Sequence, residues 1–115
     1  MLFICYPKCT TCRKAQKWLN EKGSSYDFRD ISQNNPTYDE LKAWVERSKL
    51  PIRKFFNTSG LLYKSLELKK KLEAMSEDEQ LRLLSTDGML VKRPLLITED
   101  YILVGFNEKE WSQLV

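Results

Sequence analysis

Apolar residues along the chain gather in short runs and helical stripes, and their order predicts a βαβ unit at the start. The apolar run at residues 2–5 is typical of a buried strand. Residues 10–22 carry apolar side chains at helical spacing, and Gly23 can end that helix in a left-handed conformation. Residues 26–31 alternate between apolar and polar positions, which predicts a second strand, parallel to the first.

The middle of the chain predicts helices and no strand. Thr37 and Ser76 each stand three positions before a glutamate, which is the pattern of a capping box at a helix start. We expect a turn after a short helix that ends near residue 55. The expected helical segments are residues 37–48, 52–55, 66–74 and 76–87.

The last quarter of the chain predicts a β-hairpin followed by a helix. Residues 94–98 and 101–104 are apolar runs joined by a short acidic turn, and Asn107 can cap a final helix. The whole order indicates a thioredoxin-like α/β fold with a mixed four-stranded sheet. An all-helical insertion at about residues 37–88 would separate the βαβ half from the ββα half. We expect one domain that spans residues 1–115.

Composition and charge exclude several classes of protein. Of the 115 residues, 30% are charged and 42% are hydrophobic, as in an ordinary soluble domain. No apolar run approaches the ~20 residues that span a bilayer, and basic residues interrupt residues 1–22. We therefore expect no membrane contact, no signal peptide and a cytoplasmic location. The net charge of +3 is too small to indicate nucleic-acid binding, and a monomer is the expected state.

Cys9 and Cys12 form a C-x-x-C pair at the predicted strand-to-helix junction. In a cytoplasmic protein such a pair is more often catalytic or metal-binding than a structural disulfide. The chain has three cysteines and no histidine, whereas a tetrahedral zinc site takes four such ligands, so we expect no metal. The remaining interpretations are a working redox pair and two unreactive, partly buried thiols.

The start of a helix allows a cysteine to ionise without a histidine. The unpaired N–H groups of the first turn and the helix dipole stabilise a thiolate, and Lys8 and Arg13 flank the pair. In C-x-x-C motifs of this kind the nucleophilic thiolate forms near neutral pH. We therefore expect Cys9 to be the nucleophile and Cys12 the resolving thiol, with Lys8 and Arg13 in contact with the substrate.

Arg93 and Pro94 stand directly before a predicted strand, far from the cysteines in sequence. Proline at the start of a strand costs no ladder hydrogen bond, and a bond before proline tolerates the cis form. In a thioredoxin-like layout this segment faces the C-x-x-C. Arg93 would then stabilise a Cys9 thiolate and hold an oxyanion, with Pro94 beside the substrate. The alternative is a surface arginine before a trans proline. Cys5 is expected to be a small buried apolar residue.

Four stretches give the chain a resemblance to a known family. They read C-T-T-C-R-K-A at residues 9–15, F-N-T-S-G at 56–60, K-R-P-L-L at 92–96 and V-G-F-N at 104–107. Over nearly its whole length the chain is similar to the ArsC/Spx/YffB family, which has a thioredoxin-like fold with a helical insertion. Its paired cysteines make it more similar to the Spx-like relatives.

The resemblance implies two functions from different classes. One branch of the family reduces arsenate, which makes Cys9 the attacking cysteine and Arg93 the arginine before the proline. A small oxyanion or a disulfide would be the substrate. Glutathione with glutaredoxin, or thioredoxin, would be the thiol reductant, and no cofactor would be bound. The Spx branch comprises redox-sensing regulators, and the partner would then be the RNA polymerase α subunit.

Two positions differ from the glutaredoxin-linked arsenate reductases. The resemblance places Asn57 and Gly105 where those enzymes have arginines that help to hold the oxyanion. Each charge-assisted contact is worth ~1.5–3 kcal/mol, so their loss would weaken arsenate binding. The leading hypothesis is an ArsC-type thiol–disulfide oxidoreductase with arsenate as its candidate substrate. The alternative is a redox-sensing binding protein.

Overall fold

Four short strands form one mixed sheet in the order β2-β1-β3-β4. β1 runs parallel to β2 and antiparallel to β3, and β3 and β4 form an antiparallel hairpin. The predicted βαβ unit, the hairpin and the α/β fold class are therefore confirmed. In the computed structural model, which describes residues 1–115, the strands are β1 (Leu2–Cys5), β2 (Asp27–Asp30), β3 (Leu95–Ile97) and β4 (Ile102–Val104).

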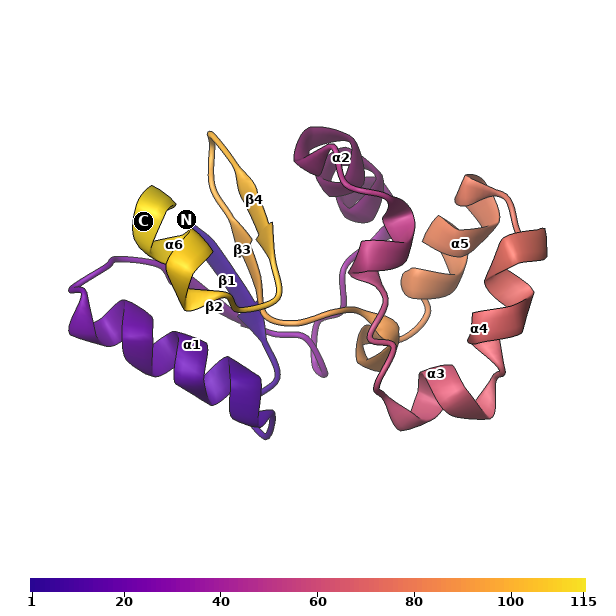
Figure 1. The fold of residues 1–115 in the computed structure, drawn as a ribbon, viewed down its shortest axis with the longest axis horizontal. Helices are drawn as coiled ribbons and strands as arrows, with labels where there is room; N and C mark the ends of the chain where they lie inside the picture. The colour runs from indigo at the N-terminus through magenta and orange to yellow at the C-terminus, as the bar shows by residue number, and fades with distance from the viewer.

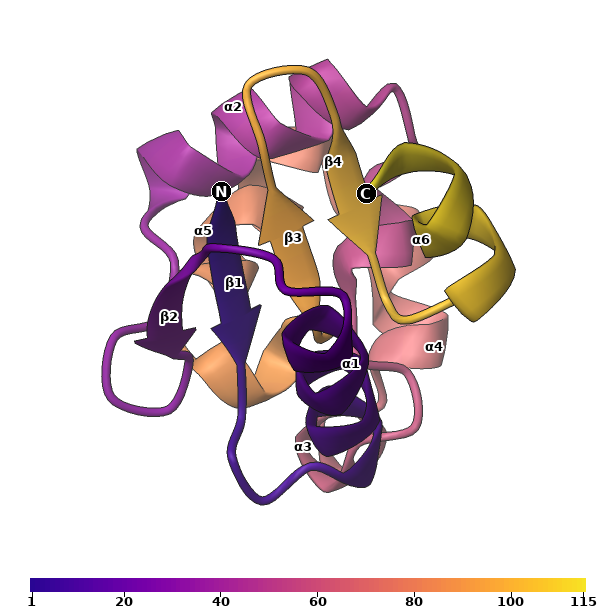
Figure 2. The same cartoon turned by 90° about the vertical axis from the view of Figure 1, so that its left-hand side faces the viewer.

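Two helices, α1 and α6, cover one face of the sheet (Figures 1 and 2). Successive side chains of β1 point to opposite faces, so Phe3 and Cys5 join the apolar cluster under these helices while Ile4 joins the cluster on the other face. Cys12 of α1 lies in the same cluster as Cys5. The bounds are Thr10–Glu21 for α1 and Glu108–Leu114 for α6.

Every element between β2 and β3 is helical, as the sequence predicts, and this helical part packs beside the other face of the sheet (Figure 1). Sixteen buried residues form the core that the sheet shares with it. Its elements are α2 (Tyr38–Ser48), the 3₁₀ helix η1 (Ile52–Phe55), α3 (Leu61–Ser65), α4 (Leu68–Lys71), η2 (Leu72–Ala74), α5 (Glu77–Leu84) and η3 (Gly88–Leu90).

The predicted caps fix three helix starts. The Thr37 hydroxyl accepts a hydrogen bond from the N–H of Glu40 at 3.1 Å, and the Glu40 carboxylate accepts one from the N–H of Thr37 at 3.0 Å. Ser76 and Glu79 make the same two bonds at the start of α5, each at 3.1 Å. The amide oxygen of Asn107 caps α6. Each of these caps satisfies backbone donors that the helix itself leaves unpaired.

The prediction lacks one helix and misplaces two helix boundaries by at least two residues. The sequence shows no helix at α3, because none of its residues is buried and Leu61 is 87% exposed, so no apolar stripe marks it. The helix expected over 66–74 begins only at Leu68, because the backbone of Glu67 is left-handed with φ of 55°. The helix expected to reach residue 87 ends at Leu84.

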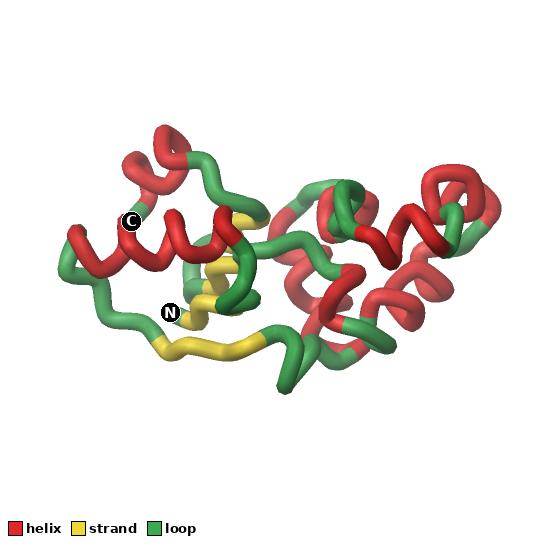
Figure 3. Tube along the Cα trace, turned by 90° about the horizontal axis from the view of Figure 1, so that it is seen from below, coloured by secondary structure: helices red, strands yellow, loops and turns green.

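Two connections join the sheet to the helical part, at residues 31–37 and 91–94 (Figure 3). Beside the first of them Gly88 lies so near Ile31 that a Cβ at residue 88 would be 2.2 Å from the Ile31 carbonyl oxygen. Arg29 of β2 also pairs with Glu40 of α2 at 2.7 Å. The sheet and the helical part therefore meet in a tight, specific contact.

The longest helix has 12 residues. No helix in the structure combines the length and the apolar character that crossing a membrane would require.

Candidate functional site

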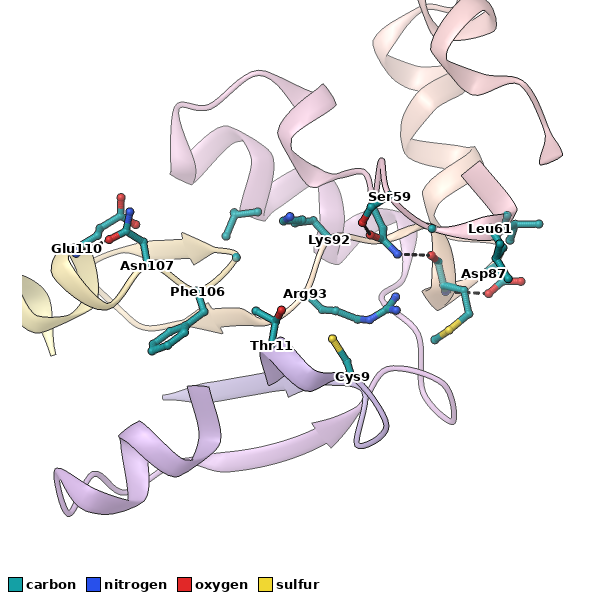
Figure 4. A pocket seen from close by; sticks show the side chains of 16 residues that line it. Cys9, Thr11, Ser59, Leu61, Asp87, Lys92, Arg93, Phe106, Asn107 and Glu110 are labelled. Atoms are coloured by element: carbon teal, nitrogen blue, oxygen red, sulfur yellow. Dashed lines mark hydrogen bonds between the residues drawn. The ribbon is translucent and has the colours of Figure 1, made fainter. Parts of the chain in front are cut away.

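A cavity of about 820 Å³ opens between the sheet and the helical part. Four segments that are distant in sequence line it: the start of α1, the loop into α3, the segment from η3 to β3, and the turn from β4 to α6 (Figure 4). The volume is within the range of pockets that hold a small organic ligand. The residues with polar or reactive side chains on its wall include Cys9, Thr11, Asn57, Ser59, Asp87, Lys92, Arg93, Asn107 and Glu110.

Cys9 occupies the N-cap position of α1, where the chain leaves β1 and turns into the helix. Its N–H donates to the carbonyl of Tyr6 at 2.9 Å, which fixes this turn. Its side chain makes no capping hydrogen bond and is half-buried on the cavity wall. The thiol therefore lies beside the unpaired N–H groups of the first turn and remains open to a substrate.

Arg93 enters the cavity from the segment before β3, and in Figure 4 the Cys9 sulfur points toward its side chain, which runs across the cavity past that sulfur. The peptide bond between Arg93 and Pro94 is cis, as the sequence allows. The guanidinium carbon lies 5.3 Å from the centre of the Tyr6 ring. The buried Nε and Nη1 atoms of Arg93 have no hydrogen-bond acceptor within the protein. Buried donors without an acceptor are costly, so this guanidinium favours an anion in the cavity.

Cys12 lies in the first turn of α1, three residues after Cys9, and is fully buried. Its sulfur accepts a hydrogen bond from the N–H of Tyr6 at 3.3 Å. Hydrogen bonding with the buried Cys5 raises the pKa of the Cys12 thiol, and burial raises it further. All three cysteines are free thiols. The buried Cys12 thiol therefore stays protonated, and its neighbour Cys9 is only half-buried.

The structure brings together some of the predicted site residues and not others. Cys9 and Arg93 share the cavity, whereas Cys12 and Pro94 are buried and do not line it. Lys8 and Arg13 are exposed and do not line the cavity. The Nε of Arg13 instead donates to the carbonyl of Pro7 at 2.9 Å.

Asn57 and Gly105 both line the cavity, although neither carries a charge. Asn57 is anchored by its N–H, which donates to the Leu90 carbonyl at 2.8 Å. Gly105 has φ of 76°, and a Cβ at this position would come within 3.2 Å of Cε of Lys92. A side chain at residue 105 would therefore be strained here. The neutral groups leave Arg93 and Lys92 as the only cations on the cavity wall.

Sequence reasoning missed the contribution of Lys92, Ser59 and Asp87 to the cavity. Lys92 could have been found, because it directly precedes the predicted arginine. Ser59 and Asp87 carry no such signal, since they reach the cavity only through the packing of the helical part against the sheet.

Sequence comparison places the chain among known proteins. The model of the ArsC family matches residues 5–114. The uncharacterized protein YusI of Bacillus subtilis is 51% identical over 113 residues, which are 98% of this chain and 96% of that protein. The global transcriptional regulator Spx of Bacillus subtilis is 30% identical over 104 residues, which are 90% of this chain and 78% of the regulator.

Solved structures agree with this placement. A Bacteroides fragilis protein described as related to the ArsC family has a TM-score of 0.96 and 55% identity, and the match covers 99% of this chain and 96% of that one. A "possible arsenate reductase" from Streptococcus mutans has a TM-score of 0.88 and 44% identity, with 96% of each chain covered. The chain described here, with its thioredoxin-like sheet and its cysteine at the start of α1, is a member of the ArsC family.

Proposed function

We propose that this protein is a thiol–disulfide oxidoreductase in which Cys9 is the nucleophile and Cys12 the resolving thiol. The observation that carries the proposal is the pairing of an accessible thiol at the start of α1 with an arginine whose buried donors lack an acceptor. A Cys9 thiolate, or an anionic substrate attached to it, would supply the acceptor that this guanidinium lacks.

With a disulfide substrate the reaction has two steps. The Cys9 thiolate attacks one sulfur of the substrate, so that a mixed disulfide forms and the other substrate sulfur leaves with the electron pair. Cys12 then loses its proton and attacks Cys9 Sγ, which releases the second substrate thiolate and leaves a Cys9–Cys12 disulfide. A thiol reductant such as glutathione with glutaredoxin, or thioredoxin, would return the pair to its reduced state.

Arsenate is the candidate oxyanion substrate, because the similar Streptococcus mutans structure is described as a possible arsenate reductase. Cys9 would attack As(V) and displace water, and Arg93 would hold the oxyanion. Attack of Cys12 on Cys9 Sγ would then break the S–As bond, and its electron pair would remain on arsenic as As(III). With neutral groups at Asn57 and Gly105, we expect arsenate to be bound weakly and disulfides to be the better substrates.

The test uses the aromatic disulfide 5,5′-dithiobis(2-nitrobenzoate), because each step releases one coloured thiolate. In the fast phase wild type is expected to release two equivalents per site, and Cys9→Ser to release none. Cys12→Ser, the matched control, should stop after one equivalent. A Cys9→Ser variant that releases two equivalents as fast as wild type would refute the assignment.

The second release should also depend on pH. Since the pKa of Cys12 is raised, its reactive thiolate remains a minor species near neutral pH. The resolution rate should therefore climb about tenfold for each pH unit between 6 and 8. A rate that levels off below pH 7 would contradict a raised pKa for the resolving thiol.

A second function is favoured by one finding, the similarity to the regulator Spx. In that case the Cys9–Cys12 disulfide would control binding to the RNA polymerase α subunit rather than complete a catalytic cycle. A pull-down of purified α subunit should then succeed with one oxidation state of the protein and fail with the other. This function would be excluded if the oxidised, reduced and Cys9→Ser forms all retained no more of the polymerase α subunit than empty resin does.

A further inference from the structure

Cys5 is the one thiol that the proposed reaction leaves unused, and it is not isolated. It ends β1 on the same face as Phe3, and it belongs to the same buried cluster as Cys12. The N–H that donates to the Cys12 sulfur at 3.3 Å is that of Tyr6, the residue bonded to Cys5. That nitrogen is about 2.4 Å from the Cys5 Cα, so the Cys12 sulfur lies within about 5.7 Å of the Cys5 Cα.

These positions place the two thiols near each other. A disulfide also requires that the two side chains point toward each other. The side chain of Cys5 points to the face of the sheet that α1 covers, which is the face where Cys12 is buried. The hydrogen bond between the two thiols also lowers the pKa of Cys5, although burial opposes that effect.

The three sulfurs are arranged in an order suited to exchange. Cys12 lies one helical turn from Cys9 and in the same buried cluster as Cys5, whereas Cys9 packs against that cluster and is half-buried on the cavity wall. Thiol–disulfide exchange passes through an attack on the central sulfur of three. Cys12 is that central sulfur, with Cys5 on its buried side and Cys9 on its cavity side.

We infer that Cys5 is a third redox thiol, which attacks the Cys9–Cys12 disulfide and takes over Cys12 as its partner. This inference rests on the proposed function, because that reaction forms the starting disulfide. Cys5 loses a proton to solvent and a Cys5–Cys12 bond forms. The Cys9–Cys12 bond breaks, and its electron pair leaves with Cys9 as a thiolate. The number of disulfides is unchanged, so no further oxidant is needed, and Cys9 becomes free for a second substrate.

A distinctive product follows when no reductant is present. In excess oxidised glutathione, the freed Cys9 attacks a second molecule and retains one glutathionyl group, while Cys5 and Cys12 remain linked. Wild type should therefore carry both an internal disulfide and a glutathione adduct on Cys9. Cys5→Ala should stop at the Cys9–Cys12 disulfide and lose the adduct. Intact mass after acid quenching and alkylation under denaturing conditions measures both species.

Trypsin identifies the linked residues, because cleavage after Lys8 and Arg13 separates Cys5 from the other two cysteines. A Cys9–Cys12 bond remains inside the peptide 9–13, whereas a Cys5–Cys12 bond joins the peptides 1–8 and 9–13. We expect the joined peptides in wild type and their loss in Cys5→Ala. A second measurement does not depend on the folding of Cys5→Ala. The Cys9→Ser variant, treated with diamide, should form the same joined peptides.

The outcomes separate this inference from the proposed function. If the peptide 9–13 contains its internal disulfide while Cys5 is always recovered alkylated, the third thiol is refuted and the proposed function stands. If wild type forms no disulfide within the peptide 9–13 and no joined peptides, the proposed function fails and the exchange fails with it. Joined peptides in Cys9→Ser but never in wild type would show a Cys5–Cys12 pair without exchange, which also overturns the inference.

Discussion

In the proposed reaction, Arg93 is the residue whose geometry most directly affects reactivity. Its guanidinium is a planar fork that lies over Tyr6, and two of its nitrogens are buried without an acceptor. A lysine would keep the positive charge, but it would lack the fork and the stacking surface. The charge and the hydrogen-bond geometry of Arg93 can therefore be separated by substitution.

We expect Arg93→Met to slow alkylation of Cys9 by iodoacetamide at pH 7 about tenfold, since charge-assisted hydrogen bonds are worth at least about 1.5 kcal/mol. Arg93→Lys should recover only part of the rate. Lys92→Gln, which removes the other cation of the cavity wall, serves as the matched control and should change the rate less. Equal rates in wild type and Arg93→Met would show that the arginine does not act on Cys9.

At the scale of elements, the Arg29–Glu40 pair ties β2 to the start of α2. Nη1 and Nη2 of Arg29 donate to the two carboxylate oxygens of Glu40 at 2.7 and 2.9 Å. The hydrogen bonds from Arg29 lower the pKa of Glu40. A carboxylate with a lowered pKa in the folded state stabilises the fold above its unfolded pKa of about 4.3, and this stabilisation is lost as pH falls through the folded pKa.

The Glu40→Gln variant tests this link. Between pH 7 and pH 3, wild type should lose about 1–2 kcal/mol more unfolding free energy than Glu40→Gln, as measured by urea denaturation. Asp39→Asn, in the same helical turn, is the control and should behave like wild type. If Glu40→Gln and wild type show the same pH dependence, the ion pair contributes nothing to stability.

Elements with strong local signals could be predicted from the sequence. The capping boxes at Thr37 and Ser76 and the apolar runs of the strands required no tertiary information. α3 could not be predicted, since none of its residues is fully buried and no apolar stripe marks it. The residues of the candidate site also differ in whether a local sequence signal marks them. Cys9 and Arg93 have motif signals, whereas Ser59 enters the cavity only because the helical part packs against the sheet.

At the scale of the whole molecule, Gly88 sets how closely the helical part can approach the sheet. The atom that a Cβ would meet is a backbone oxygen of Ile31, at 2.2 Å, and backbone cannot move aside as a flexible side chain can. In the sequence, Gly88 follows Asp87 and indicates only the end of a helix. In the fold, Gly88 is a contact between the two parts that enclose the cavity.

Gly88→Ala should therefore lower the unfolding free energy by about 1–3 kcal/mol, the usual cost of overpacking. Gly23→Ala is the comparison, because a Cβ there would meet nothing within 4 Å and only its φ of 70° opposes the change, at a cost of about 1 kcal/mol. Thermal or urea unfolding measures both. A Gly88→Ala variant no less stable than Gly23→Ala would show that this contact is looser than described.

The aromatic cluster under α1 and α6 has a practical consequence. The rings of Trp18 and Trp111 are 6.0 Å apart and share their cluster with Cys5 and Cys12, while Trp44 belongs to the cluster on the opposite face. Disulfides quench indole emission at short range. The native fluorescence of this protein should therefore dim when Cys12 is oxidised, so redox titrations can be followed optically without any added dye, with Trp44 as a constant background.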